Sequence, residues 1–212
     1  MIATNALYLV DSGGQYYDGT TDVTRTVCFD PPTAEEKEAY TLVLKGNLAL
    51  HSLKWPDNTI GIQIDAFARK ALWDVGLNYA HGTGHGVGSF LAVHEGPHGI
   101  GPRLPKLSAP LEANMISSNE PGFYKAGAFG IRIENLEVVT ATTLKYNTML
   151  GFDTLTVAPL CRPLIDVNLL TAQERSMVNA YHQWVCQTLR PRLEEKGDQL
   201  AVAYLLEHCS PV

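Results

Sequence analysis

The sequence predicts an α+β protein in which helices cover a sheet, and three observations support this prediction. Extended, glycine-punctuated segments occupy residues 6–29, two amphipathic helical patterns follow over residues 33–75, and further alternating segments lie between residues 115 and 158. A hydrophobic period near 3.6 indicates a helix and a period of two indicates a strand. With 212 residues, 45% of them hydrophobic, the chain is long enough to bury a sizeable core as a single domain over residues 1–212.

The first extended segment predicts a β-hairpin that carries two acids. An apolar run over residues 6–10 ends at Asp11, and Asp22 follows after Gly13, Gly14 and Gly19, which permit chain reversal. Residues 23–29 are the expected second strand. Aspartates at strand ends are more often turn formers or caps than ligands, so a metal site requires further donors from elsewhere in the chain.

Two helices are expected next. Thr33 and Glu36 have the spacing of a capping box, which predicts an amphipathic helix that runs to about Trp55. A second helix over residues 61–75 is expected to end at Gly76. Its predicted buried stripe consists of Ile62, Ile64, Phe67, Ala68, Ala71 and Leu72.

The segment over residues 78–97 combines three histidines with closely spaced glycines. A lone histidine is more often a core or surface residue than a ligand, and His51 on the first helix is interpreted as a surface residue. His81, His85 and His94 lie together in a glycine-rich segment. Because glycines let a substrate or an ion approach closely, this grouping favours a functional site.

Two further acids lie in or next to predicted strands. Strands are expected over residues 115–118 and 129–140, and they place Glu120 and Glu134 near strand ends. Arg132 and Glu134 alternate with isoleucines and therefore share one face of their strand. The remaining expected elements are a loop over residues 99–113, a strand over residues 154–158, a helix that begins at a Thr171–Glu174 capping box and is kinked or interrupted at Pro191, and a helix over residues 198–208.

Composition restricts the class of partner. A net charge of −6 and a pI of about 5.6 argue against nucleic acid or an acidic membrane surface as the main partner. The sequence contains neither an apolar run long enough for a membrane helix nor a signal pattern, so we expect a cytoplasmic protein. The four cysteines have no metal-binding spacing and are expected to be free thiols.

The acids and one histidine at strand ends and in glycine-rich turns form a candidate metal site. Together they carry a formal charge of −4, which two divalent cations would neutralise. Oxygen ligands with one imidazole suit Mn²⁺, Mg²⁺, Co²⁺ or Zn²⁺, and a pair of such ions suggests hydrolysis. The candidate ligands are Asp11, Asp22, His85, Glu120 and Glu134.

Four long motifs in this order resemble a known family. The chain is similar, essentially from Tyr8 to its C-terminus, to the catalytic domain of the Xaa-Pro aminopeptidases (aminopeptidase P) of the cytosolic three-domain type, which are pita-bread metallopeptidases. The resemblance implies the pita-bread fold, a curved antiparallel sheet covered by helices. The motifs are YLVDSGGQYYDGTTDVTRT, HGTGHGVGSFLAVHEGP, SSNEPGFY and GIRIENLEVV.

The resemblance also implies a ligand scheme. Asp11 and Asp22 would chelate one metal, and Asp22 would also reach the second. His85 and Glu120 would bind the second metal, and Glu134 would bridge the pair. Mn²⁺ is the ion most associated with the family, with Co²⁺ and Zn²⁺ as alternatives.

Further residues receive roles by the same resemblance. Glu120 would take and relay the proton of the attacking water. His94 would hold the substrate carbonyl or stabilise the oxyanion, and His81 would line the pocket near the substrate proline. Arg132 and Tyr124 match supporting positions around the site. The implied substrates are peptides with proline second, and the implied assembly is a homodimer through the C-terminal helices.

Family members of this type carry two domains upstream of the catalytic one, and the upstream part of the catalytic half contains another substrate-contacting histidine. We therefore expect this sequence to be a C-terminal piece of a longer protein, which retains every metal ligand and whose activity in isolation is an open question.

Three alternatives remain at this point. Prolidase, which cleaves Xaa-Pro dipeptides, and methionine aminopeptidase share the fold. A non-catalytic pita-bread relative that binds protein partners is the third, although such relatives have typically lost metal ligands. Peptide length preference separates the enzymes from one another, and affinity for Mn²⁺ separates them from the binding module.

Overall fold

The computed structural model describes residues 4–103 and 108–212, which form two compact units. The first unit combines the segment that ends at Tyr8 with Val27–Thr41 and Val157–Val212. The second unit comprises Leu9–Thr26 and Leu42–Thr156 and contains all the candidate site residues. Both units combine helical and extended segments of sequences that lie far apart in the chain.

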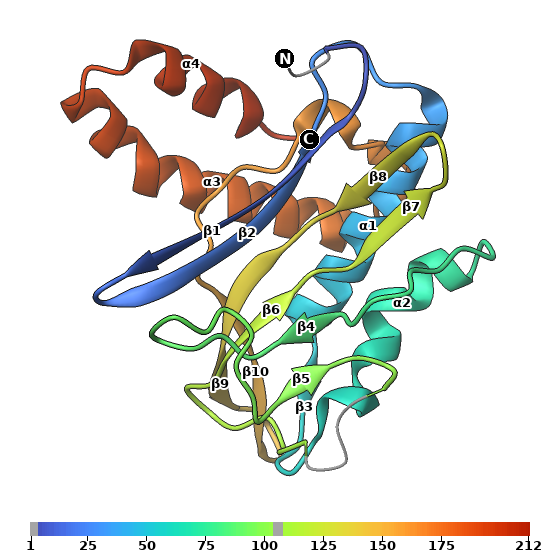
Figure 1. Cartoon of the computed structure of the whole chain (residues 1–212), viewed down its shortest axis with the longest axis vertical. Coiled ribbons are helices and arrows are strands. Elements are labelled where there is room, and N and C mark those ends of the chain that lie inside the picture. Colours follow the sequence, from blue (N-terminus) through green and yellow to red (C-terminus); the bar gives the residue numbers. More distant parts are fainter. Residues whose placement is uncertain (1–3, 104–107) are drawn as a thin grey trace. The chain divides into compact units, whose positions relative to one another are not determined.

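The predicted hairpin is present as β1 (Tyr8–Tyr16) and β2 (Gly19–Val27) (Figure 1). The chain reverses at residues 17–18, so Gly13 and Gly14 lie within β1 and not in the turn. The prediction placed the start of the second strand too late, because a two-residue connection lets pairing begin at once.

A four-stranded antiparallel sheet forms the centre of the second unit (Figure 1). In the register of this sheet Phe152 pairs with Val139, and Ser118 pairs with Leu136. Two short strands, β4 (Gly84–His85) and β5 (Gly99–Ile100), pair with each other, and a bridge from Gly86 to Ser117 joins them to the sheet. The sheet order is β3 (Lys54–Trp55), β10 (Thr148–Thr154), β9 (Asn135–Thr143) and β6 (Ile116–Asn119).

The strand expected over residues 129–140 is two strands, which is a correction. β8 (Phe129–Arg132) pairs with β7 (Gly122–Lys125), which was not predicted, and β9 begins only at Asn135. The break occurs because the Glu134 N–H donates to the carbonyl of Thr24 at 3.1 Å. The chain therefore turns from β7 toward β2 at the position of a candidate ligand.

Two other strand predictions also need correction. The strand expected over residues 154–158 is wrong except at Thr154, because β10 spans Thr148–Thr154 and residues 155–158 are not in a strand. The strand begins early because the Leu144 N–H donates to the Asn147 carbonyl at 2.9 Å and reverses the chain. The segment expected as a loop over residues 99–113 includes β5, and residues 104–107 of that segment lie outside the described residues.

The first helix has the predicted capping box. In α1 (Ala34–Ser52) the Thr33 N–H donates to Glu36 Oε2 at 2.7 Å, and the Glu36 N–H donates to Thr33 Oγ1 at 3.2 Å. The helix ends at Ser52, before the predicted Trp55, because residues 54–55 pair with β10. His51 is not a free surface residue, since its Nδ1 lies 3.1 Å from Oε1 of the fully buried Glu137.

The second helix buries a different stripe from the predicted one. A 3₁₀ turn, η1 (Gly61–Gln63), precedes α2 (Asp65–Trp73), and Gly76 ends the segment with φ +79°. Ile62 and Phe67 are each 44% exposed, whereas Asp65 and Arg69 are buried. The 3₁₀ turn has fewer residues per turn than an α-helix, so it rotates the side chains of α2 relative to the predicted buried face. Asp65 and Arg69 can be buried there because their opposite charges pair. The core of this unit comprises Leu50, Trp55, Ile64, Ala68, Ile100, Leu111, Val139, Leu150 and Phe152.

The first unit contains the two predicted C-terminal helices, α3 (Ala172–Glu195) and α4 (Gln199–His208). The Thr171–Glu174 capping box is confirmed. Pro191 lies inside α3 and does not interrupt it, since the helix continues to Glu195 and its last turn is closed by the Lys196 N–H, which donates to the Arg192 carbonyl at 3.3 Å. Two short turns, η2 (Arg162–Leu164) and η3 (Val167–Leu169), precede these helices.

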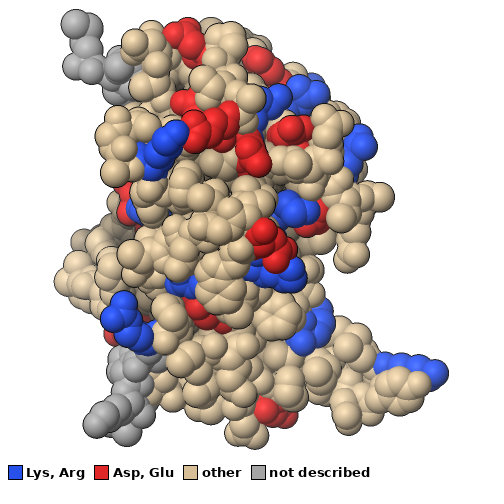
Figure 2. All heavy atoms as spheres, turned by 90° about the vertical axis from the view of Figure 1, so that its right-hand side faces the viewer, with Lys and Arg blue, Asp and Glu red and all other residues tan. Residues whose placement is uncertain are grey.

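The surface carries charges of both signs, and the cysteines are free thiols as expected. Positive and negative side chains are interspersed on the face in Figure 2, so neither sign dominates that face. The four cysteines are free thiols, and the sulfur atoms of Cys28 and Cys161 lie 3.8 Å apart. Among the helices that the structure describes, none has the length and apolar character needed to cross a membrane.

Candidate metal centre

The five predicted ligands converge on one cavity of about 430 Å³ in the second unit. They come from β1, β2, β4, the end of β6 and the break between β8 and β9. Segments separated by more than a hundred residues therefore deliver their polar side chains to one place. The cavity is lined by Asp11, Gly13, Gly14, Gln15, Thr21, Asp22, His85, Val93, His94, Glu120 and Glu134.

The donor atoms are close enough to share cations. His85 Nε2 lies 3.5 Å from Asp22 Oδ2 and 3.3 Å from Glu120 Oε1. Three groups of residues have donor atoms that all lie within 4.8 Å of one another, and Asp22, His85 and Glu134 each belong to two of these groups. The groups are Asp22, His85 and His94; His85, Glu120 and Glu134; and Asp11, Asp22 and Glu134.

The orientation of His85 is fixed by its neighbours. Its Nδ1 lies 3.1 Å from the carbonyl of Gly86, and its backbone N–H donates to Ser118 Oγ at 2.9 Å. Because a carbonyl can only accept, Nδ1 carries the proton and Nε2 presents a lone pair to the carboxylates. Ser118 Oγ in turn donates to Glu120 Oε1 at 3.1 Å. This hydroxyl connects the backbone of His85 to the carboxylate of Glu120.

Glu134 is held by two residues that sequence analysis missed. Thr24 Oγ1 donates to Glu134 Oε2 at 2.6 Å, and Arg25 Nη1 donates to the Glu134 carbonyl at 2.6 Å. Thr24 lies two positions after Asp22 on β2, so the two side chains share one face of the strand. This two-residue spacing could have nominated Thr24 from the sequence. The contact of Arg25 with Asn135 Oδ1 at 2.7 Å had no such signal, because it depends on the break after β8.

Burial makes the charged forms of these groups unfavourable. Burial and the charge of Asp11 raise the pKa of Asp22. Burial, followed by the charge of Glu134, raises the pKa of Glu120 to about 8. Burial also raises the pKa of Glu134 to about 7, and the charge of Asp22 adds to this effect. In His85 burial lowers the pKa, so the imidazole is held neutral.

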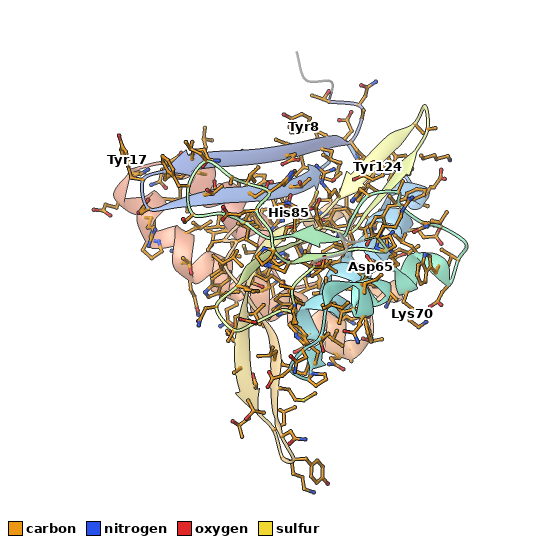
Figure 3. All side chains as sticks on the ribbon, turned by 60° about the horizontal axis from the view of Figure 1, so that its bottom comes forward. Tyr8, Tyr17, Asp65, Lys70, His85 and Tyr124 are labelled. Carbon is orange, nitrogen blue, oxygen red and sulfur yellow. The ribbon has the colours of Figure 1, made fainter. Side chains whose placement is uncertain are left out.

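Arg132, Tyr124 and His81 form a hydrogen-bonded row that reaches the cavity through Asp11, and Figure 3 labels Tyr124 and His85. Arg132 Nη2 donates to Asp11 Oδ2 at 2.7 Å, and Nη1 donates to the Tyr124 hydroxyl oxygen at 2.9 Å. The same hydroxyl lies 2.9 Å from His81 Nε2. Arg132 Nε is also 3.8 Å from Glu120 Oε2. The two predicted supporting residues, Arg132 and Tyr124, thus contact each other, Tyr124 also contacts His81, and Arg132 lies close to two of the acids.

His94 lies exposed beside His85, with ring centroids 4.1 Å apart and an interplanar angle of 65°. This position is compatible with contact to a substrate in the cavity. The structure therefore brings together every residue that the sequence nominated, while the roles of these residues as ligands, proton carriers or substrate contacts stay predictions.

The donor set fits divalent cations. Four carboxylates and a neutral imidazole meet in a partly buried cavity, where the acids disfavour one another's charge. Bound cations would favour the ionised carboxylates and remove this repulsion. The oxygen-rich set with one nitrogen suits Mn²⁺, Co²⁺ or Zn²⁺.

Comparison with known proteins identifies the family. Residues 1–141 match the model of metallopeptidase family M24, and residues 148–212 match the model of the C-terminal region of peptidase M24. A protein from Laccaria bicolor named "Probable Xaa-Pro aminopeptidase P" is 50% identical over 216 residues, which cover 100% of this chain and 33% of the relative.

Solved structures agree with this assignment. The X-prolyl aminopeptidase of Caenorhabditis elegans, described as a cytosolic enzyme with a di-nuclear active site, is 42% identical with a TM-score of 0.94 over 99% of this chain and 34% of that one. Dipeptidase PepE of Mycobacterium ulcerans is 33% identical with a TM-score of 0.62 over 76% of this chain and 40% of that one. The chain spans about a third of the length of the relatives named Xaa-Pro or X-prolyl aminopeptidase.

These matches confirm the predicted resemblance and the α+β pita-bread fold. More than half of the chain matches the family model, and the similarity extends over both compact units. The chain belongs to metallopeptidase family M24.

Proposed function

We propose that this chain carries the dinuclear metal centre of an aminopeptidase that cleaves the bond between the first residue of a peptide and a proline in second position. The observation that supports this proposal is the convergence of four carboxylates and one imidazole in a single cavity, in three overlapping groups of donor atoms. The relatives named Xaa-Pro or X-prolyl aminopeptidase supply the reaction class.

Asp11, Asp22, His85, Glu120 and Glu134 would hold two divalent cations, for which we propose Mn²⁺. When bound, such a pair polarises a carbonyl group and lowers the pKa of a water molecule, which is the chemistry that peptide hydrolysis requires. Co²⁺ and Zn²⁺ are the competing ions because they accept the same ligand set.

Glu120 is the proposed proton carrier of the reaction. Its carboxylate is partly buried, hydrogen bonded by Ser118 and raised in pKa to about 8 by burial and by Glu134. A carboxylate in such a position can accept a proton from the attacking water and deliver it to the departing proline nitrogen. Ser118 fixes the orientation of the carboxylate for both transfers.

The substrate is held by residues at the sides of the cavity. We propose that His94 contacts the carbonyl of the scissile bond and that His81, together with Tyr124, lines the pocket for the proline ring. Arg132 holds Asp11 and Tyr124 in place through two hydrogen bonds. Proline has no N–H and a fixed ring, so a pocket of rings and small residues suits it better than a site that requires strand-like pairing.

We favour the aminopeptidase over the dipeptidase. The aminopeptidase structure from Caenorhabditis elegans covers 99% of this chain with a TM-score of 0.94, whereas the dipeptidase PepE structure covers 76% with a TM-score of 0.62. The description of the former as cytosolic also supports a cytoplasmic location. A homodimer through α3 and α4, and a single catalytic domain over residues 1–212, remain proposals that sedimentation and limited proteolysis would test.

The test combines metal analysis with substrate choice. After extensive dialysis the chain is titrated with Mn²⁺, and release of the first residue is measured for an Xaa-Pro-Yaa tripeptide, an Xaa-Pro dipeptide and an Xaa-Ala-Yaa tripeptide. The expected result is Mn²⁺-dependent cleavage of the Xaa-Pro-Yaa tripeptide alone. The same assay on the chain extended by the upstream region of its relatives measures the contribution of that region.

Asp22→Asn and Asp18→Asn form a matched pair of variants on the same hairpin. Asp18 is exposed in the turn, so its variant should retain metal binding and cleavage, whereas Asp22→Asn should lose metal affinity by at least about 100-fold. A chain without affinity for Mn²⁺ would instead be a non-catalytic relative, and preference for the dipeptide would indicate a prolidase.

A further inference from the structure

Helix α2 buries an ion pair that contacts the start of the histidine-containing segment over residues 78–97. Arg69 is 1% exposed and Asp65 is 4% exposed, and Arg69 Nε donates to Asp65 Oδ2 at 2.7 Å. Removing two charges from water is costly unless their other polar atoms are also satisfied. The partners of these atoms therefore show what the pair holds in place.

The guanidinium of Arg69 holds the backbone that leads to the site. Nη1 donates to the Tyr79 carbonyl at 2.7 Å and to Asn78 Oδ1 at 3.1 Å, and Nη2 donates to the His81 carbonyl at 2.8 Å. The guanidinium carbon also lies 3.9 Å from the centroid of the Tyr79 ring. The planar guanidinium of Arg69 thus holds residues 78–81 against α2.

Thr83 completes a closed ring of hydrogen bonds. Its Oγ1 donates to Asp65 Oδ1 at 2.5 Å and lies 2.6 Å from the Tyr79 hydroxyl. Since the one hydroxyl proton of Thr83 goes to the carboxylate, the Tyr79 hydroxyl must donate to Thr83. The donor of each hydrogen bond is then known. The Tyr79 hydroxyl donates to Thr83, and the Thr83 hydroxyl donates to Asp65. Arg69 closes the ring because it donates both to Asp65 and to the Tyr79 carbonyl.

The backbone of Thr83 connects the ring of hydrogen bonds to the candidate metal centre. Its carbonyl accepts the N–H of Glu120 at 2.8 Å. A side chain on the neighbouring Gly84 would place its Cβ 2.0 Å from the Ser118 carbonyl, so this segment packs directly on β6. The ring of hydrogen bonds is therefore linked to Glu120 through the Thr83 carbonyl.

The same segment fixes His81. Its Nδ1 lies 2.7 Å from the Gly82 carbonyl, so Nδ1 carries the proton and Nε2 accepts from the Tyr124 hydroxyl at 2.9 Å. The tautomer of His81 thus depends on the backbone that Arg69 and Thr83 hold.

We propose that Thr83 is a positioning residue, and that the ring formed by Asp65, Arg69, Tyr79 and Thr83 sets the positions of Glu120 and His81 for the reaction. This inference rests on the proposed function. A core that served packing alone would tolerate the replacement of a buried polar ring by apolar groups of similar volume. A ring that positions a proton carrier and a histidine of the substrate pocket does not tolerate it without loss of turnover.

The test uses Thr83→Val, which keeps the shape and removes the hydroxyl, and Thr83→Ser, which keeps the hydroxyl. Thr59→Val is the matched control in the same unit, because Thr59 is 6% exposed and its hydroxyl donates to the Pro56 carbonyl at 2.7 Å. Tyr79→Phe is a milder variant that retains the ring over Arg69 and keeps the proposal testable if Thr83→Val does not fold.

The expected result is a decrease in kcat of about tenfold to hundredfold for Thr83→Val, with a smaller change in KM, since a misplacement on the order of 1 Å has effects of this size. Tyr79→Phe should give a smaller decrease in the same direction. Thr83→Ser should restore most of kcat, and Thr59→Val should leave it unchanged. Mn²⁺ affinity and the thermal unfolding temperature are measured alongside.

Nitrogen-15 NMR of the His81 ring provides a readout that needs no turnover. Thr83→Val should change the ring nitrogen shifts of His81, whereas Thr83→Ser and Thr59→Val should not. Equal kcat values for Thr83→Val and Thr59→Val, with unchanged His81 shifts, would overturn the proposal. If the unsubstituted chain and its upstream-extended form both bind Mn²⁺ but hydrolyse no Xaa-Pro-Yaa peptide, the proposed function fails, and the NMR comparison still decides whether Thr83 positions His81.

Discussion

The α2 ring and the cavity both bury carboxylates in the second unit, and they differ in the source of the compensating positive charge. On α2, Asp65 receives hydrogen bonds from Arg69 and Thr83 on its two oxygens. In the cavity, Glu120 and Glu134 are hydrogen bonded by neutral hydroxyl groups, and burial together with neighbouring acids raises both pKa values. The α2 ring is complete within the protein, whereas the cavity leaves its negative charge for a ligand to neutralise.

This difference separates a structural use of a buried acid from a functional one. A buried charge with a full set of partners rigidifies its surroundings. A group of buried acids with few positive neighbours is instead a candidate cation-binding site. Figure 3 shows both places, with His85 in the cavity and Asp65 on α2. The following predictions test whether the two places respond to metal, pH and substitution in opposite ways.

The largest expected effect is stabilisation by metal. Mn²⁺ at a hundredfold excess over its dissociation constant should raise the free energy of unfolding by about 2.7 kcal/mol for each of two bound ions. Thermal unfolding with and without Mn²⁺ measures this increase. In Glu134→Gln the increase should be largely lost, and an undiminished increase would show that the ions bind elsewhere.

The metal-free chain should have a distinctive pH dependence. An acid whose folded pKa exceeds its unfolded value holds its proton longer in the folded state, so stability falls as pH rises between the two values. For Glu134 the window runs from its ordinary value of 4.5 to about 7, and for Glu120 it runs from 4.5 to about 8. The metal-free chain and Glu134→Gln should therefore have similar stability near the lower limit, and the variant should become the more stable one as pH rises to 7. A constant difference across this window would contradict the raised pKa of Glu134.

The next largest effect concerns the α2 ring. Asp65→Asn leaves the charge of Arg69 buried without its carboxylate and should lower the free energy of unfolding by about 3 to 5 kcal/mol. Chemical denaturation measures this loss. The double variant Asp65→Leu with Arg69→Met removes both charges and should recover most of the stability without recovering kcat. Equal stability of the single and double variants would show that the pair is not coupled.

The site was more predictable from sequence than the helix beneath it. The sequence nominates five ligands because they lie at strand ends or in glycine-rich turns and within the four family motifs: Asp11, Asp22, His85, Glu120 and Glu134. All five converge on the cavity. The chemistry of a site depends on residue type and local motif, and both are visible in the sequence.

The errors lie where tertiary contacts override local patterns. Phe67 fits the apolar stripe of α2 by spacing but is 44% exposed, whereas Asp65 and Arg69 are buried. Periodicity assigns charged residues to solvent, and it has no means of recognising that an i,i+4 pair has partners at Tyr79, His81 and Thr83. The same limitation applies to His51, whose buried partner Glu137 lies 86 positions away.

The smallest expected effect comes from a second ion pair on the same helix, and it sharpens the comparison with Asp65 and Arg69. Lys70 Nζ lies 2.6 Å from Asp74 Oδ2, also at i,i+4, but the two side chains are 70% and 60% exposed. Because water and salt screen exposed charges, Lys70→Ala should change the free energy of unfolding by less than about 0.5 kcal/mol. Denaturation at low and high salt measures the change, which should shrink further as the ionic strength rises. A loss as large as that of Asp65→Asn would mean that burial does not distinguish the two pairs, and the contrast between a closed internal ring and an ordinary surface contact would then have to be abandoned.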